Sequence, residues 1–469
     1  MKKLFLTLTL FAVCTGVSAA EVLRLNLEQA IDLALNQNRT IKIAEKEIQR
    51  VDYARQQIRG GLLPSVTGSA QYTRAIQKQE MLLNMGGGGG IDLSGFDELN
   101  NILPGLGTGL ANAFGQMFGG MMGGGPMQVG SDNTLTFGVT ASLPLIAPGL
   151  WRSIQISRTD VDIALEKSRS SRLAMVNEVK KAYYQALLAQ QSYQVLQQSM
   201  NSAKESLENV RNMHNQGLVS EFDLIRADVQ VRNMNPMLVM ARDGVTLSSL
   251  LVKVLLSIPN EVSLELTDNL ASFEQSILAS EVPRVANLNR NTDLMQLDLN
   301  LQKMEQQHQL IRTQNMPTLA AFANYQYMGM GDDGVKMHFS SPFMVGFQMN
   351  VPIFSGLSRV RQSQQMRIGI EQVELQRDFF KDNLNVQAQN IINQMTRTKE
   401  QIASNKESVR LAERGVEISQ VRYRTGVGTL LEKNDADLAL VQARMNYYQS
   451  LSEYLIAKSN LEHLLGNDK

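Results

Sequence analysis

Glu432 and Asp435 are the two side chains whose type and spacing come closest to a site. Residues three apart share one face of a helix, and both follow the glycine-containing segment Gly426–Gly428, where a helix is expected to begin. Carboxylates are favoured at helix N-termini by the backbone dipole. Taken alone, the pair therefore predicts a solvated helix start.

No other residues suggest catalysis or metal binding. The four histidines show no close ligand spacing, which favours structural or surface roles. Five consecutive glycines begin at Gly86, but they do not lie between a strand and a helix, so a phosphate-binding loop is not indicated. We expect neither enzymatic activity nor a cofactor. The histidines are His214, His308, His338 and His463.

The N-terminus predicts export. Lys2 and Lys3 precede an apolar run, and Ser18-Ala19-Ala20 follows it, the pattern of a signal peptide covering residues 1–20. Its removal would take away the only cysteine, Cys14, and two of 45 basic residues, leaving 43 against 45 acidic. This near-balance gives no indication of a nucleic-acid partner. No later stretch approaches the roughly 18 apolar residues of a membrane helix.

Two segments carry an apolar residue at every seventh position, which predicts long helices with narrow, coiled-coil-like seams. They span about 150–215 and 357–425, and at about 1.5 Å per residue each would be on the order of 100 Å long. The positions are Val179, Ala186, Tyr193, Met200, Leu207 and His214 in the first, and Ala388, Met395, Ile402, Val409, Val416 and Tyr423 in the second.

Period-two alternation predicts four strands of membrane-crossing length, at about 65–75, 133–145, 318–328 and 342–353. The order of helix, two strands, long helix and helix then occurs twice. Glycines at the helix turns are 209 apart (426 − 217), and prolines ending the second strand of each pair are 208 apart (352 − 144). The repeats are expected at 21–257 and 286–469, joined by an irregular connector at 258–285.

The repeat also locates an insertion. Prolines before the first strands are 253 apart (317 − 64), so about 45 extra residues lie between the strands of the first hairpin. This is the Gly- and Met-rich segment 84–130. It is expected to be a surface loop, and the alternative is a cap over the mouth of a barrel.

Four strands cannot close a barrel, and an open sheet edge in lipid leaves backbone groups unpaired. The fold class predicted is therefore an α+β membrane protein completed by further copies of the chain. Two copies would give eight strands and a filled barrel, whereas three would give twelve and leave room for a lumen. Polar residues flanking the helix seams suit a helical cylinder that is wet on both sides.

The chain resembles the TolC-type outer-membrane efflux proteins over nearly its whole expected mature length. The similar stretches are LNLEQAIDLALNQN near the N-terminus, HNQGLVSEFDLIRADVQ, YRTGVGTLLEKNDADLALVQARMNYYQ and the last helix, SLSEYLIAKSNLEHLLG. The resemblance implies a homotrimer, with a 12-stranded outer-membrane β-barrel continued by a 12-helix periplasmic α-barrel. It also implies a periplasmic adaptor and an inner-membrane pump, driven by protons or ATP, as partners.

The resemblance also assigns roles at the two helix turns. Glu432 and Asp435 match the carboxylates that ring the periplasmic aperture, and Asp223 and Tyr423 match a polar contact that holds it closed. Where the family often has a basic residue in this contact, this chain has Gly428, so the resting aperture is expected to be held differently. The resemblance also implies that the adaptor docks on the two turn segments, which consist of Gly217, Leu218, Val219, Gly426, Val427 and Gly428.

The aromatic residues of the strands and their flanks suit a membrane-interface belt, with ordinary strand propensity as the alternative reading. They are Tyr72, Phe137, Trp151, Tyr325, Tyr327, Phe343, Phe347 and Phe354.

The function expected is an outer-membrane exit duct of a tripartite efflux or type I secretion system. The alternatives are a passive pore or spacer of the same fold and, with less support, a secreted coiled-coil adhesion or adaptor protein. The sequence does not identify the cargo.

Overall fold

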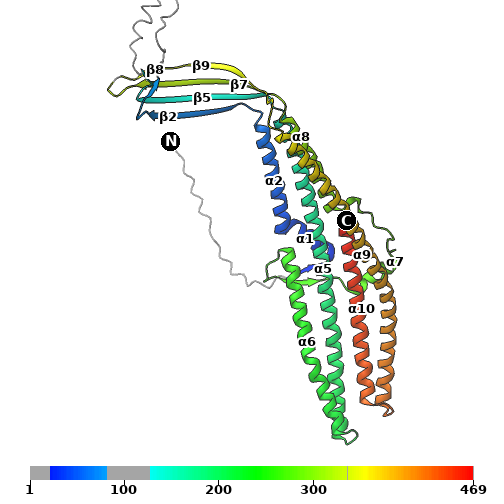
Figure 1. Ribbon diagram of the computed structural model, residues 1–469. Helices are drawn as coiled ribbons and strands as arrows, with labels where there is room; N and C mark the ends of the chain where they lie inside the picture. Colours follow the sequence, from blue (N-terminus) through cyan, green and yellow to red (C-terminus); the bar gives the residue numbers. More distant parts are fainter. Residues whose placement is uncertain (1–21, 82–126, 335, 468–469) are drawn as a thin grey trace, which may run out of the picture. The chain divides into compact units, whose positions relative to one another are not determined.

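The computed structural model describes residues 22–81, 127–334 and 336–467. The expected signal peptide 1–20, with Cys14, and the Gly- and Met-rich segment 84–130, apart from 127–130, lie outside the described residues. The chain divides into two units (Figure 1). One contains the residues up to Ile58, Trp151–Thr313 and Phe354 onwards, and the other contains Arg59–Leu150 and Gln314–Ile353.

The second unit is an antiparallel sheet of four long strands. They run in the order β2 (Ser65–Arg74), β5 (Asn133–Ile146), β7 (Thr318–Gly331) and β9 (Phe343–Asn350), with the short β8 (His338–Ser340) also paired to β7. The central β5–β7 pair joins the two sequence repeats. A separate ladder, β3 (Gln79–Met81) with β4 (Met127–Val129), flanks the segment that is not described.

The register places most of the apolar residues of the four strands on one face, although Phe322 and Met344 lie on the other. Ala70 lies opposite Phe137, Phe137 opposite Tyr327, and Tyr325 opposite Phe343. Directly paired residues of antiparallel strands point to the same side of a sheet. The residues between them, such as Thr67, Thr140 and Asn324, therefore form a second face that is mainly polar. This alternation is typical of strands that separate lipid from water.

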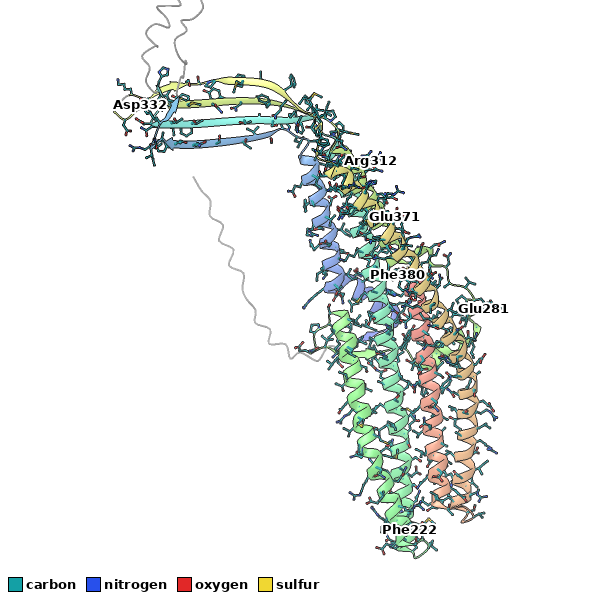
Figure 2. The ribbon with its side chains drawn as sticks, in the orientation of Figure 1. Phe222, Glu281, Arg312, Asp332, Glu371 and Phe380 are labelled. Carbon is teal, nitrogen blue, oxygen red and sulfur yellow. The ribbon has the colours of Figure 1, made fainter. Side chains whose placement is uncertain are left out.

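Ion pairs connect the two repeats at the end of the sheet that contains the β7–β8 turn. Lys78 Nζ lies 2.8 Å from Asp332 Oδ1 and 3.3 Å from Asp132 Oδ1, and Arg74 Nη2 lies 2.7 Å from Asp333 Oδ2. Figure 2 labels Asp332 beyond the end of β7. These contacts join the β7–β8 turn to residues near both ends of the first hairpin loop.

The helical unit contains two long helices, α5 (Pro148–Asn215) with 68 residues and α9 (Ser358–Arg424) with 67. Each is followed by a helix of 36 residues, α6 (Glu221–Leu256) and α10 (Leu430–Leu465). The main core includes Tyr183 and Leu187 of α5, Ile402 of α9, and Leu451 of α10. The heptad seams therefore pack against other parts of the same chain, and every seam residue named above is buried or partly buried.

The single helix expected before the two strands of each repeat is broken at an asparagine. In the first repeat it consists of α1 (Leu27–Gln37) and α2 (Arg39–Gly60), and in the second of a 3₁₀ turn, η2 (Leu288–Arg290), and α8 (Thr292–Thr313). Asn38 Nδ2 donates to the Leu255 carbonyl at 2.7 Å, and Asn291 Nδ2 donates to the Leu464 carbonyl at 2.8 Å. Both side-chain oxygens accept backbone amides of the following helix, so the asparagines cap it and interrupt the helical ladder.

The connector at 258–285 is more regular than expected. It contains β6 (Ser263–Leu266), a 3₁₀ turn η1 (Leu270–Phe273) and α7 (Glu274–Ala279). β6 pairs in parallel with β1 (Val22–Leu25), which lies at the start of the first repeat. Strands of four residues are too short to give a clear period-two signal. In the part of the chain that the structure describes, no helix combines the length and apolar character needed to span a membrane.

Candidate functional site: the two helix turns

The α5–α6 and α9–α10 turns share one backbone design. Gly217 and Gly426 both have φ of +73°, the left-handed conformation that ends a helix and that glycine adopts without strain. The amide of Leu218 donates to the Met213 carbonyl at 2.9 Å, and the amide of Val427 donates to the Arg422 carbonyl at 3.0 Å. These equivalent bonds reverse the chain in the same way at both turns.

The following helices are capped in the same way. Ser220 Oγ accepts from the amide of Asp223 at 3.2 Å, and Thr429 Oγ1 accepts from the amide of Glu432 at 3.2 Å. Asp223 and Glu432 therefore occupy the same position in the two repeats, 209 residues apart (432 − 223). Both carboxylates lie in the first turn of a helix, where the helix dipole stabilises negative charge.

A small apolar cluster packs the two turns against each other. Its buried members are Val210 of α5, Ala227 of α6 and Leu430 of α10. Val219 and Tyr423 pack against it, with Leu207 and Leu224.

Two apolar side chains of the turns are exposed: Leu218 is 66% exposed and Val427 is 70% exposed. The structure thus presents two apolar side chains to solvent beside a packed turn. Figure 2 shows Phe222, also exposed, at the same end of α6.

Asp223 and Tyr423 lie near each other but are not joined by a hydrogen bond. The Asp223 carboxylate accepts from the Ser220 hydroxyl at 2.7 Å. Burial, and to a lesser extent the charge of Asp223, raises the pKa of the Tyr423 hydroxyl. That hydroxyl is buried and has no hydrogen-bond partner among the described residues.

The two carboxylates expected at the aperture have different surroundings. Arg422 Nη2 lies 3.5 Å from Glu432 Oε2. Asp435 is exposed and forms no ion pair or hydrogen bond within the described chain. Arg422 was not selected from the sequence. The signal that could have identified it is its spacing from Glu432: the two residues are ten apart, on either side of the glycine turn, so the reversal of the chain can bring them together.

Gly428 accounts for the close approach of this ion pair. A Cβ placed on Gly428 would lie 2.9 Å from Arg422 Cβ and 3.1 Å from Glu432 Oε2. With the present backbone, a side chain at this position would displace one of these groups. The basic residue common in related turns therefore does not fit here without rearrangement.

Lys433 contributes a second cation near the turn, but its charge is engaged. It is buried, and its Nζ lies 2.8 Å from Asp437 Oδ2 one helical turn further on. A buried ammonium requires such a partner because burial strongly disfavours isolated charge. Lys433 is therefore paired with Asp437 and not with Asp435.

The aromatic residues expected at the membrane interface are all exposed. The strand members, from Tyr72 to Phe347, follow the register to the apolar face of the sheet. Trp151 and Phe354 belong to the helical unit.

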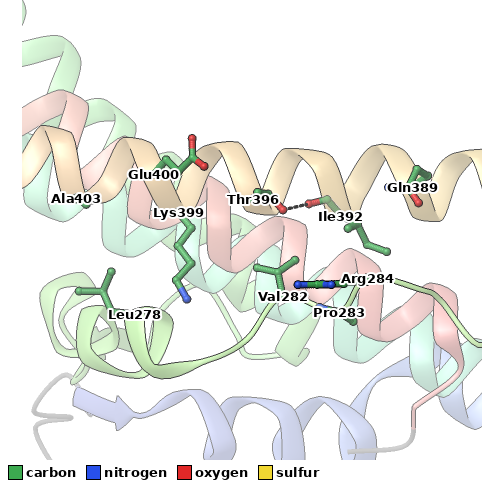
Figure 3. A pocket seen from close by; sticks show the side chains of 10 residues that line it. All are labelled: Leu278, Val282, Pro283, Arg284, Gln389, Ile392, Thr396, Lys399, Glu400 and Ala403. Atoms are coloured by element: carbon green, nitrogen blue, oxygen red, sulfur yellow. Dashed lines mark hydrogen bonds between the residues drawn. The ribbon is translucent and has the colours of Figure 1, made fainter.

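Away from the turns, an open groove lies between the connector and α9 (Figure 3). Leu278, Val282 and Ile392 supply apolar lining, and Lys399 Nζ donates to the Ser280 carbonyl at 2.6 Å. The groove contains none of the residues expected at the aperture. Among the residues whose structure is described, no cluster of His, Cys, Asp and Glu could hold a metal ion.

The model of the outer membrane efflux protein family matches residues 30–255 and 285–467. The chain belongs to this family. The gap between the two matched segments contains most of the connector at 258–285. Membership confirms the predicted family and its location in the outer membrane with a periplasmic extension.

A curated relative, the outer membrane protein TolC of Salmonella enteritidis, is 21% identical over 344 residues, which cover 67% of this chain. The chain spans 66% of that relative's length. Among solved structures, the Campylobacter jejuni CmeC outer membrane channel has a TM-score of 0.66 and 16% identity, over 94% of this chain and 85% of CmeC.

The open state of the Neisseria gonorrhoeae MtrE outer membrane channel has a TM-score of 0.69 and 14% identity, over 94% of this chain and 88% of MtrE. At such identities the likeness of these two channels to the chain establishes the fold.

Proposed function

We propose that this protein is the outer-membrane exit duct of a tripartite efflux or type I secretion system. In this proposal a homotrimer carries substrates that an inner-membrane pump, driven by protons or ATP, delivers through a periplasmic adaptor. The single observation that carries the proposal is the sheet, which has one mainly apolar and one mainly polar face and, among the long strands described, two without an outer neighbour.

The sheet supports assembly from several copies. In the described chain β2 and β9 each pair on one side only, with β5 and β7 respectively. Unpaired strand edges are not tolerated in the hydrocarbon of a membrane. Pairing β9 of one copy with β2 of the next would close the edges, and three copies would give twelve long strands.

The helical unit supports the same arrangement. α6 exposes apolar residues along its length, among them Met240, Leu247, Leu251 and Val254, at spacings of three, four and seven. Such a stripe is typical of a helix that packs against another helix. In a trimer, four long helical segments per chain would form a cylinder of twelve.

The turns support an aperture and an adaptor site. Glu432 and Asp435 would lie at the aperture, with Asp223 and Tyr423 beside it. The exposed Leu218 and Val427, on the glycine turns Gly217–Val219 and Gly426–Gly428, would provide adaptor contacts. The aromatic residues of the apolar sheet face would contact lipid.

Efflux can be tested in the native host. We expect deletion of the gene to increase susceptibility to exported toxic compounds or to abolish secretion of a cargo protein, and the wild-type gene to restore the phenotype. The double variant Leu218→Asp, Val427→Asp should form heat-sensitive trimers in the outer membrane yet fail to restore it, because it loses the apolar adaptor contacts.

The matched control, Leu218→Met with Val427→Ile, keeps the apolar surface and should restore the phenotype. A passive pore would conduct ions in lipid bilayers, while its deletion would leave both susceptibility and secretion unchanged. That pair of results would contradict the proposed export function.

A further inference from the structure

We propose that Arg422 neutralises Glu432, so that Asp435 carries the unpaired negative charge of the α9–α10 turn and sets its contribution to ion selectivity. This rests on the proposed function, in which the turn lies at the aperture of a trimeric duct. Resemblance alone treats the two carboxylates as equivalent, whereas the structure pairs Glu432 with Arg422 and gives Asp435 no partner among the described residues.

The Arg422–Glu432 contact spans the reversal of the chain. Arg422 lies in the last turn of α9 and Glu432 in the first turn of α10, and their side chains meet at 3.5 Å. Both are about half exposed, at 49% and 50%. The contact of such an exposed pair adds little stability. With the guanidinium 3.5 Å from the carboxylate, however, the pair as a whole carries no net charge toward a passing ion.

The backbone at Gly428 permits this contact. The amide of Gly428, like that of Val427, donates to the Arg422 carbonyl, at 2.9 Å. These two hydrogen bonds to one carbonyl draw the chain close to Arg422, where a Cβ on Gly428 would clash. In the first turn, the Met213 carbonyl accepts from the amides of Gln216 and Leu218, and the described backbone bonds include none from Val219 to Met213.

The other cations of this turn do not compete for Asp435. Lys433 is buried against Asp437, and Arg424 Nε donates to the Gln420 carbonyl at 3.4 Å. Arg424 therefore offers a control: it has the same side chain, two residues from Arg422, and contacts no carboxylate in the described chain.

The experiment measures the reversal potential of purified trimers in planar bilayers under a potassium chloride gradient. Arg422→Gln should shift it toward the potassium equilibrium potential, because three Glu432 carboxylates lose their counter-ions. Asp435→Asn should shift it the opposite way. Arg424→Gln should leave it close to that of the wild type.

A charge swap tests pairing rather than total charge. Arg422→Glu with Glu432→Arg keeps the pair in reversed order and should retain the wild-type reversal potential, whereas Arg424→Glu with Glu432→Arg should not. Equal shifts for Arg422→Gln and Arg424→Gln would overturn the inference. The absence of any conductance in wild-type trimers would instead contradict the proposed function.

Discussion

The two helix turns have the same backbone but present different chemistry. Each has a left-handed glycine, the same helix-closing hydrogen bond and a hydroxyl N-cap that binds the third amide of the next helix. At equivalent positions, however, the first turn has Met213, Val219 and Arg226 where the second has Arg422, Gly428 and Asp435.

This difference separates structural from functional residues. The duplicated glycines and caps are what any such reversal needs, so they recur at offset 209. The positions that diverge decide charge and packing. The first turn places a side chain, Val219, against the apolar cluster, whereas the second uses the space beside Gly428 for an ion pair.

Exchanging the divergent residues should produce the largest effect. Gly428→Val introduces the side chain of the first turn where a Cβ already meets Arg422, and overpacking of this kind costs about 1–3 kcal/mol. We expect hydrogen exchange, followed by mass spectrometry on intact trimers, to accelerate in peptides covering 419–431.

The reciprocal variant, Val219→Gly, is the control. It removes a partly buried side chain without a clash, and should accelerate exchange less, in peptides covering 211–222. Equal acceleration in the two variants would mean that adding a side chain at Gly428 disturbs its turn no more than removing the one at Val219 disturbs the other.

Substituting the shared glycines should produce equal effects. Gly217 and Gly426 have the same φ, and a Cβ added to either would meet no atom within 4 Å, so only backbone strain distinguishes alanine from glycine. Each alanine variant should destabilise its own turn by about 1–2 kcal/mol, measured by local hydrogen exchange. Clearly unequal costs would show that the backbones are not equivalent.

Removing the caps should have a smaller effect. Ser220→Ala and Thr429→Ala should each cost about 1 kcal/mol of local stability. Ser220→Ala should cost more than Thr429→Ala, because the Ser220 hydroxyl also donates to the Asp223 carboxylate. The same exchange measurement checks this, with Ser220→Thr and Thr429→Ser as controls that retain the hydroxyl.

The smallest effect is expected at Tyr423. Its hydroxyl has no partner among the described residues, so Tyr423→Phe should stay within about 0.5 kcal/mol of the wild type at neutral pH. His214, at the equivalent position, has a ring nitrogen 3.2 Å from the Val219 carbonyl, so His214→Phe should cost about 1 kcal/mol.

The effect of Tyr423→Phe should also depend on pH. The raised pKa of Tyr423 means that folding favours its neutral form, so this stability is present below the pKa of the unfolded state and is lost as pH rises through the folded one. Above about pH 10 the turn of Tyr423→Phe should therefore open less than that of the wild type. Identical alkaline profiles would contradict the assigned burial.

Much of the fold could be predicted because its signals are long. The seven-residue spacing locates α5 and α9 to within about two residues of 150–215 and 357–425, and alternation locates strands such as β2 at Ser65–Arg74. The breaks at Asn38 and Asn291 were not predicted, because each depends on a carbonyl more than 170 residues away.

The site was only partly predictable for the same reason. Repeat arithmetic places Glu432 at the position of Asp223, but their surroundings depend on side chains that differ between the two repeats, such as Arg422 and Met213. The Arg422–Glu432 pair requires a tight reversal at Gly428, and the sequence by itself does not give the distance between side chains across a turn.

In the proposed duct, the α9–α10 turn lies at the aperture of a conducting trimer. The most direct test introduces Asp435→Cys, the only cysteine of the expected mature chain, and adds a bulky thiol reagent during single-channel recording. We predict that conductance falls stepwise in this variant and is unchanged in the wild-type trimer. Complete labelling of Asp435→Cys without any change in conductance would contradict this position of the turn.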